Sequence, residues 1–191
     1  MATAEPSRQS IDARSHTAWS PFSSHGALRA PKPTVLAAIA FAGVAAAATT
    51  VALGLTNGQV DHVGIRVFLN DWITLNFIGA GLIAWWRRPD SHFGLLMVAA
   101  GFVNFLATLD WATAAVPYTI GAALDLLAPV VFLHVFLAYP SGRLSGRLEL
   151  AIVVGAYAAA IGVGLGRMVL GGAGPGNVIQ IASAPRGVEL V

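Results

Sequence analysis

The sequence predicts an all-α integral membrane protein with about five transmembrane helices in an up-down bundle. Three observations lead to this fold class. Of the 191 residues, 56% are apolar and only 10% are charged, whereas a soluble domain carries about 25% charged residues. Five apolar runs approach or reach the roughly 20 residues that a helix needs to cross a hydrocarbon core. Finally, Lys and Arg collect in alternate connecting segments, as the cytoplasmic loops of membrane proteins do.

Residues 1–33 are polar and rich in Pro and Ser, and we interpret them as a disordered cytoplasmic lead. The segment holds four Lys or Arg, two acidic residues and four prolines. A signal peptide needs a short basic start followed at once by an apolar core. Because that pattern is missing here, we expect no cleavable export signal.

The first three predicted spans differ in what bounds them. Residues 34–56 carry no charge. The second run, 67–86, ends in Trp85 and Trp86 beside two arginines, which is typical of an aromatic belt next to a basic anchor. The third, 93–109, closes at an aspartate and a tryptophan.

Prolines bound the fourth predicted span, which covers residues 118–139. Pro117 precedes this span, Pro140 follows it and Pro129 lies inside it. The fifth span covers residues 150–170, after which no further run is long enough to cross a bilayer. The five spans together define a transmembrane domain over residues 34–170.

The distribution of positive charge predicts the orientation. Eight of the eleven Lys and Arg lie in the lead and in the loops after the second and fourth spans. The other three are Arg66, Arg167 and Arg186. Since cytoplasmic loops collect Lys and Arg, we expect the N-terminus inside and the C-terminus outside. Residues 171–191 would then be an extracytoplasmic Gly/Pro-rich tail, and the protein would be a multi-pass protein of the plasma membrane.

The sequence lacks the motifs of a catalytic, cofactor or metal site. It contains no cysteine, which excludes thiolate zinc sites, iron–sulfur clusters and cysteine nucleophiles. A P-loop, a Rossmann glycine pattern, HExxH and GxSxG are all absent. No two histidines stand at i, i+4 with a carboxylate to complete a metal site. We therefore expect no catalytic residue, cofactor or metal here. The scattered basic residues also argue against a nucleic-acid partner.

Polar residues inside the spans are the candidates for function, because a charge at a helix centre costs about 2.5–3.5 kcal/mol to insert. Asn76 and Asn104 are predicted at one depth, where an interhelical hydrogen bond would be architectural. His134, near the inner end of the fourth span, is either a packing histidine or a proton sensor. The full set of these intramembrane polar candidates is Asp71, Asn76, Asn104, Asp125, His134 and Arg167.

Asp125 and Arg167 are predicted to share the outer leaflet, at depths of roughly 10 Å and 5 Å for a rise of 1.5 Å per residue. The long stem of Arg167 would allow its guanidinium to meet the carboxylate. The alternative is that Asp125 is protonated or faces water while Arg167 extends to the headgroups. Asp71 lies near the outer surface, which favours an interfacial residue.

Ala158, Gly162 and Gly166 form a small-residue face on the fifth span. Such a face allows close helix approach. It fits packing within one chain as well as a dimer.

Two stretches resemble a known family. Residues 87–96 read RRPDSHFGLL and resemble a cytoplasmic turn of pattern R-x-P-x-N-x-I-G-x-L-L. Residues 133–144 read LHVFLAYPSGRL and are similar to H-x-x-L-A-[FY]-P-[SD]-G-R-L. Both patterns belong to the multi-helix N-terminal membrane regions of sensor histidine kinases from high-GC bacteria. One helical hairpin separates the two turns, as in that family.

The second of these turns has a clear physical interpretation at an inner membrane surface. An interfacial ring is followed by a proline that ends the helix, by two residues that allow a reversal, and by an arginine that anchors in the headgroup layer. The motif residues are Tyr139, Pro140, Ser141, Gly142, Arg143 and Leu144.

The resemblance implies a membrane-embedded sensor or anchor region of a two-component kinase. Such kinases continue into a dimerisation helix with the phosphoacceptor histidine and an ATP-binding domain. The sequence to Val191 contains neither, so we expect no autophosphorylation by this chain. The expected partners are the lipid bilayer and a second copy or another membrane protein.

Two other function classes stay open. A small transporter or channel would explain Asp125 four residues before Pro129, because a helix broken by proline exposes carbonyls to an ion. The other is a structural membrane subunit.

Overall fold

The computed structural model describes residues 31–58 and 62–170, and every element in these ranges is helical. Five helical segments in them are long and apolar enough to cross a membrane. The prediction of an all-α fold with five candidate spans is therefore confirmed. Residues 1–30 of the predicted lead and the predicted tail, 171–191, lie outside the described residues. The elements are α1 Pro33–Thr56, α2 Val63–Arg87, α3 Phe93–Ala107, η1 Thr108–Trp111, α4 Ala115–Leu124, α5 Leu127–Leu137 and α6 Arg147–Val169.

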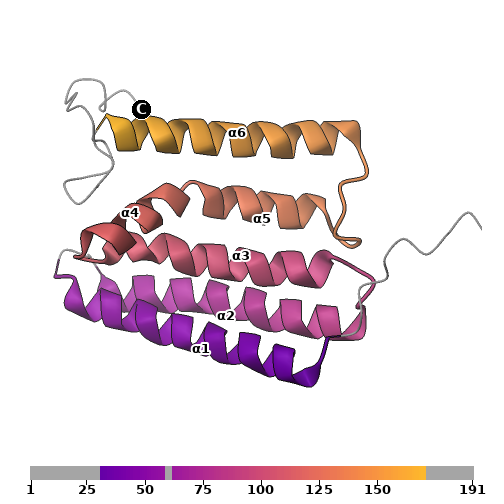
Figure 1. Ribbon diagram of the computed structural model, residues 1–191, viewed down its shortest axis with the longest axis horizontal. Coiled ribbons are helices and arrows are strands. Elements are labelled where there is room, and N and C mark those ends of the chain that lie inside the picture. The colour runs from indigo at the N-terminus through magenta and orange to yellow at the C-terminus, as the bar shows by residue number, and fades with distance from the viewer. Residues whose placement is uncertain (1–30, 59–61, 171–191) are drawn as a thin grey trace, which may run out of the picture.

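The helices lie side by side in chain order and alternate in direction, with α1 and α6 at the two edges (Figure 1). Helix α3 and the 3₁₀ helix η1 form one segment, and α4 and α5 form another. In the part of the chain that the structure describes, α6 packs only against α4 and α5. Much of its surface is consequently uncovered.

Close backbone contacts hold α2 against α3. A Cβ atom at Gly81 would lie 2.8 Å from the carbonyl oxygen of Gly94, and one at Gly101 would lie 2.9 Å from that of Thr74. Neither position therefore has room for a side chain, and the two backbones approach closely, as small residues allow in membrane bundles. Between α3 and α5, Ala100 and Val131 belong to a buried cluster against which larger apolar side chains such as Phe132 pack.

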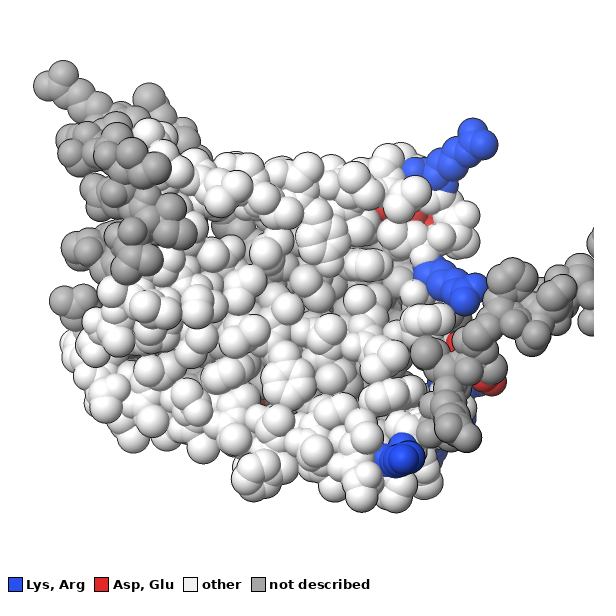
Figure 2. Space-filling model, viewed as in Figure 1, with Lys and Arg blue, Asp and Glu red and all other residues white. Residues whose placement is uncertain are grey.

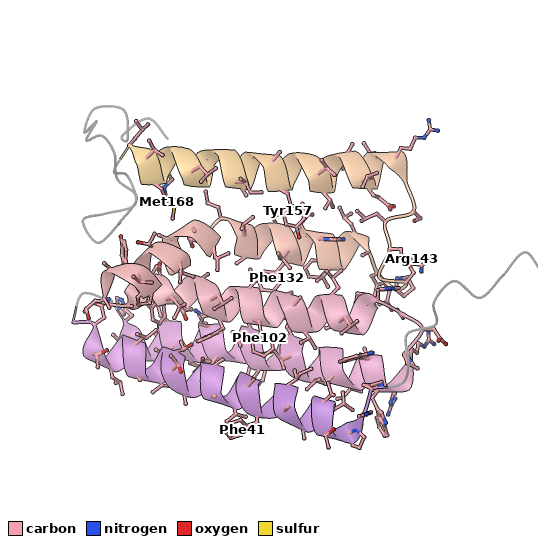
Figure 3. The ribbon with its side chains drawn as sticks, in the orientation of Figure 1. Phe41, Phe102, Phe132, Arg143, Tyr157 and Met168 are labelled. Carbon is pink, nitrogen blue, oxygen red and sulfur yellow. The ribbon has the colours of Figure 1, made fainter. Side chains whose placement is uncertain are left out.

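Large apolar side chains cover the outside of the bundle. Phe41 on α1 is 76% exposed and points away from the other helices (Figure 3). Trp72, Phe136 and Leu148 are also mostly exposed, on three further helices. A soluble monomer rarely exposes so much contiguous apolar surface. This exterior is suited to lipid.

Several helices are longer than their apolar runs predict. Helix α2 begins at Val63, four residues before the predicted start, because a helix can continue past the apolar boundary and carry Arg66 with it. Helix α6 begins at Arg147 instead of residue 150. The carboxylate of Glu149 accepts the backbone N–H groups that precede this helix, at 3.0 Å each, and so stabilises its first turn.

The fourth predicted span is not one continuous helix. Helix α4 ends at Leu124 and α5 begins at Leu127. Pro129 explains the break, because it has no N–H to donate to the carbonyl of Asp125 and its ring clashes there. Pro117 instead lies within the first turn of α4, where the N–H that a proline lacks would have no partner within the helix.

Basic residues gather at one end of the bundle (Figure 2). Five of the seven Lys and Arg in the described ranges lie there, four of them at the α2–α3 and α5–α6 turns and one directly before α1. We call this the arginine-rich end, and its basic residues are Lys32, Arg87, Arg88, Arg143 and Arg147. The opposite end holds Arg66 and Arg167.

Candidate functional site

The opposite end contains a cavity of about 370 Å³ beside the break between α4 and α5. Ala128, Pro129 and Phe132 form part of its apolar wall. Polar side chains from α2, α3, η1 and the break also line it. These are Arg66, Asn70, Asn104, Thr108, Asp110 and Asp125. So many polar groups are unusual in a chain whose helices are otherwise apolar, and we call this the polar cavity.

Helical spacing brings these side chains to one place. Arg66 and Asn70 are four residues apart on α2, so they lie on one face. Asn104 and Thr108 have the same spacing at the end of α3. Helix α4 packs onto η1 beside the cavity through Gly121, where a Cβ would fall 1.9 Å from the backbone nitrogen of Asp110. A glycine is therefore required at that contact.

Asn104 is the centre of a hydrogen-bond network between α3 and α2. Its amide donates to Thr74 Oγ1 at 3.0 Å and to the side-chain oxygen of Asn70. Thr108 donates to the carbonyl of Phe105 at 2.7 Å and lies 3.4 Å from the hydroxyl of Thr50 on α1. Three helices are thus linked next to the cavity.

Asn76 does not pair with Asn104, so the predicted hydrogen bond between them is wrong. Asn76 is exposed and donates to the carbonyl of Trp72 within its own helix, at 2.7 Å. Asn70 lies six residues earlier on α2 and faces α3 instead. Asn76 lies one turn further along α2, at the level of Gly101, which approaches Thr74 and Ile78, and its exposed side chain is on another face of the helix.

Asp125 and Arg167 are brought together, as the pairing hypothesis expects. The distance between Arg167 Nη1 and Asp125 Oδ2 is 4.0 Å. The side chain of Arg167 is 40% exposed and that of Asp125 is 54% exposed. The pair ties the break after α4 to the last turn of α6. Asp125 also lines the polar cavity.

Asp110 is the acidic residue of this site that is not among the candidates predicted from the sequence, and Arg66, Asn70 and Thr108 are not among them either. Asp110 follows the third apolar run, where an acidic residue indicates only the end of a span. In the structure its Oδ1 atom is buried without a hydrogen-bond partner among the described residues. The same holds for Oδ1 of Asp71, the residue expected at the interface. A buried carboxylate oxygen without a donor is available to a cation or to a ligand N–H.

The cavity offers oxygen ligands as well as charge. Two carboxylates, two side-chain amides and a hydroxyl line it. Pro129 also leaves the carbonyl of Asp125 without the N–H donor that a regular helix would supply. Such a set can hold a small cation or a polar molecule, although Arg66 adds an opposing positive charge.

His134 on α5 lies between helices and has a polar partner. Its Nδ1 is 3.4 Å from the hydroxyl of Tyr157 on α6, and the two rings meet edge to face at 6.0 Å. Figure 3 shows Tyr157 between these helices. The contact is what a packing histidine requires, and the proton-sensor hypothesis also stays open.

The two turns that carry the family resemblance lie against each other at the arginine-rich end. Ser91 Oγ donates to the carbonyl of Ser141 at 3.1 Å, and the rings of Phe93 and Tyr139 meet edge to face at 5.5 Å. Gly142 has a φ of +74° and lies so close that a Cβ would fall 2.2 Å from the nitrogen of Phe93. The Tyr139–Pro140 peptide bond is cis. The two motifs are separate in the sequence, which gives no reason to expect their contact.

In the described ranges no group of three or more His, Cys, Asp or Glu could hold a metal ion. In the comparisons with known proteins, no family model, curated protein or solved structure matches the chain. The candidate sites therefore rest on their own geometry.

Proposed function

We propose that this chain is a membrane-embedded sensor or anchor region of a two-component histidine kinase system. The observation that supports the proposal best is the contact between the α2–α3 and α5–α6 turns. The residues of the two motifs, including Ser91, Phe93, Ser141 and Gly142, are the ones that make this contact. Because the two motifs form the two sides of one contact, that contact explains why both occur in one chain.

The proposed orientation in the plasma membrane has the N-terminus inside and the C-terminus outside. The clustering of five basic residues at the arginine-rich end supports it, because cytoplasmic segments near membrane helices collect Lys and Arg. The polar cavity would then open toward the extracytoplasmic side. A signal that enters there would meet α3 and α5, whose other ends carry the docked turns.

The absence of cysteine allows a direct test of this orientation. Ser145→Cys places a thiol on the exposed turn before α6, and Ala114→Cys places one on the exposed segment before α4. In intact cells an impermeant thiol reagent should label the cysteine at position 114 and spare that at position 145 until the membrane is permeabilised. The reverse pattern would show that the orientation is wrong.

The link to a kinase is tested by the gene itself and by the protein. A kinase module encoded in frame beyond codon 191, or in an adjacent gene whose product co-purifies with this chain, would support the proposal. Co-purification with a permease instead would contradict it.

A small transporter or channel is the second candidate. The break at Asp125, with oxygen groups around a cavity, is the observation that favours it. Proteoliposomes containing the purified chain should show cation or proton flux that Asp125→Asn reduces. Liposomes that stay as tight as protein-free ones would exclude this candidate.

We also propose a second copy of the chain as partner. Ala158 and Gly162 of α6 are exposed, and a Cβ at Gly162 or Gly166 would meet nothing within 4 Å. The small-residue face is thus not used within the described part of the chain. Helix pairing between two copies would use it.

A further inference from the structure

The arginine-rich end contains a hollow of about 560 Å³ between the two docked turns. Arg87 and Arg88 reach it from the end of α2, and Arg143 reaches it from the turn before α6. Ser91, Ser141 and Asp90 line it as well. Three arginines and a single acidic residue therefore line one space.

These three arginines have no carboxylate partner within the described ranges, where the pair between Arg167 and Asp125 at the far end is the ion pair observed. Positive charges that converge repel one another. An anion in the hollow would remove this repulsion. Arginine is well suited to phosphate because its planar fork donates two parallel hydrogen bonds.

The frame of the hollow is fixed by contacts that do not involve the arginine side chains. Ser91 donates to the carbonyl of Ser141 and accepts the N–H of Phe93 at 3.2 Å. Ser141 bonds the backbone of Arg143 through both its donor and its acceptor, at 3.2 Å each. The serine hydroxyls are thus occupied in shaping the turns. The arginine backbones are held in place before a ligand arrives, which lowers the entropy lost on binding.

A second hollow of about 280 Å³ shares Arg87, Arg88 and Ser91 with the first. Its lining continues along Phe93 and Tyr139. Tyr139 is 71% exposed, as an aromatic ring at a membrane interface would be. A cationic hollow with apolar surface directly beside it is complementary to a phospholipid, whose anionic phosphate lies next to its acyl chains.

We propose that the hollow between the two turns is a binding site for one phosphate group, held by Arg87, Arg88 and Arg143. The phosphate can belong to a phospholipid headgroup or be free in solution, since the guanidinium groups recognise the same oxygen atoms. The proposal does not depend on a link to histidine kinases. It requires only the docked turns and their three arginines.

The test uses the full chain, purified in a neutral detergent and freed of lipid. Thermal unfolding is followed by tryptophan fluorescence against increasing phosphatidylglycerol, inorganic phosphate or phosphate-free diacylglycerol. Phosphatidylglycerol should raise the unfolding temperature in a saturable way. Arg143→Gln should raise the phosphatidylglycerol concentration needed for half of this shift about tenfold, because it removes a charged hydrogen-bond donor to the phosphate.

Arg147→Gln is the matched control. Arg147 lies at the same end and is exposed, yet it lines neither hollow. The substitution changes the net charge equally and should leave the affinity for phosphatidylglycerol unchanged. Arg143→Lys keeps the charge but loses the fork, so it should also weaken binding, which covers the case that Arg143→Gln does not fold.

The three ligands distinguish the source of the phosphate. A response to phosphatidylglycerol alone identifies a lipid headgroup site, whereas competition by inorganic phosphate at low millimolar concentration identifies a site for the free anion. Either result supports the proposal. Equal responses to diacylglycerol and phosphatidylglycerol, or equal losses in Arg147→Gln and Arg143→Gln, would overturn it.

Discussion

Asp125 Oδ2 and Arg167 Nη1 lie 4.0 Å apart and connect the break after α4 to the end of α6. The two groups come from segments that sequence places in the same leaflet of a bilayer. Each side chain neutralises the charge of the other, which would otherwise lie unpaired among apolar helices. The partial exposure of both side chains limits the strength of the attraction.

Asp125→Asn and Arg167→Gln should each lower the thermal stability of the protein in detergent. The double variant should lose less than the sum of the two, with a coupling of roughly 0.2–1 kcal/mol, the range for exposed ion pairs. Unfolding followed by tryptophan fluorescence measures all three. Strict additivity would show that the two residues do not interact and would strengthen the ion-site interpretation of Asp125.

Asn104→Leu should destabilise the bundle by about 1–2 kcal/mol, because it removes two hydrogen bonds to α2 that are worth about 0.6 kcal/mol each on average and leaves Asn70 and Thr74 without their donor. Asn76→Leu is the control. Asn76 is exposed and bonds only its own helix in the described structure, so this substitution should be neutral or stabilising. Comparable losses in both variants would contradict the observed network.

Gly142→Ala should lower the unfolding temperature and weaken the docking of the two turns. Its φ of +74° costs a residue with a side chain about 1–2 kcal/mol, and the new methyl group would collide with the backbone at Phe93. Gly155→Ala on α6 meets nothing within 4 Å and should stabilise by about 0.5–1 kcal/mol through helix propensity. An unfolding temperature for Gly142→Ala equal to that of the parent would show that the docking is not structurally important.

Gly162→Leu should reduce dimer formation without destabilising the monomer. A side chain at position 162 enters open space in one chain but would separate two α6 helices packed on their small-residue faces. Chemical cross-linking in membranes and light scattering in detergent report the dimer. Gly79→Leu, also in open space but on α2, is the control and should dimerise normally. Equal dimer fractions in both variants would place the interface elsewhere.

The sequence by itself determined the fold class and the number of candidate spans. Hydropathy sums over about 20 residues depend only on composition along the chain, and the cost of burying backbone polar groups in lipid leaves helix as the available structure. The approximate depth of a residue in the bilayer follows from the number of residues between it and the end of its span. For that reason the sequence alone predicts that Asp125 and Arg167 lie near each other.

Only the tertiary structure decided which faces meet. In a water-soluble helix an apolar stripe marks the buried side, but these helices are apolar on both the packed and the exposed sides, so sequence does not give the rotation about each axis. Asn104 therefore bonds Asn70 instead of Asn76. For the same reason Asp110 joins the polar cavity without a signal in the sequence, and the contact between Ser91 and Ser141 exists only because two hairpins pack side by side.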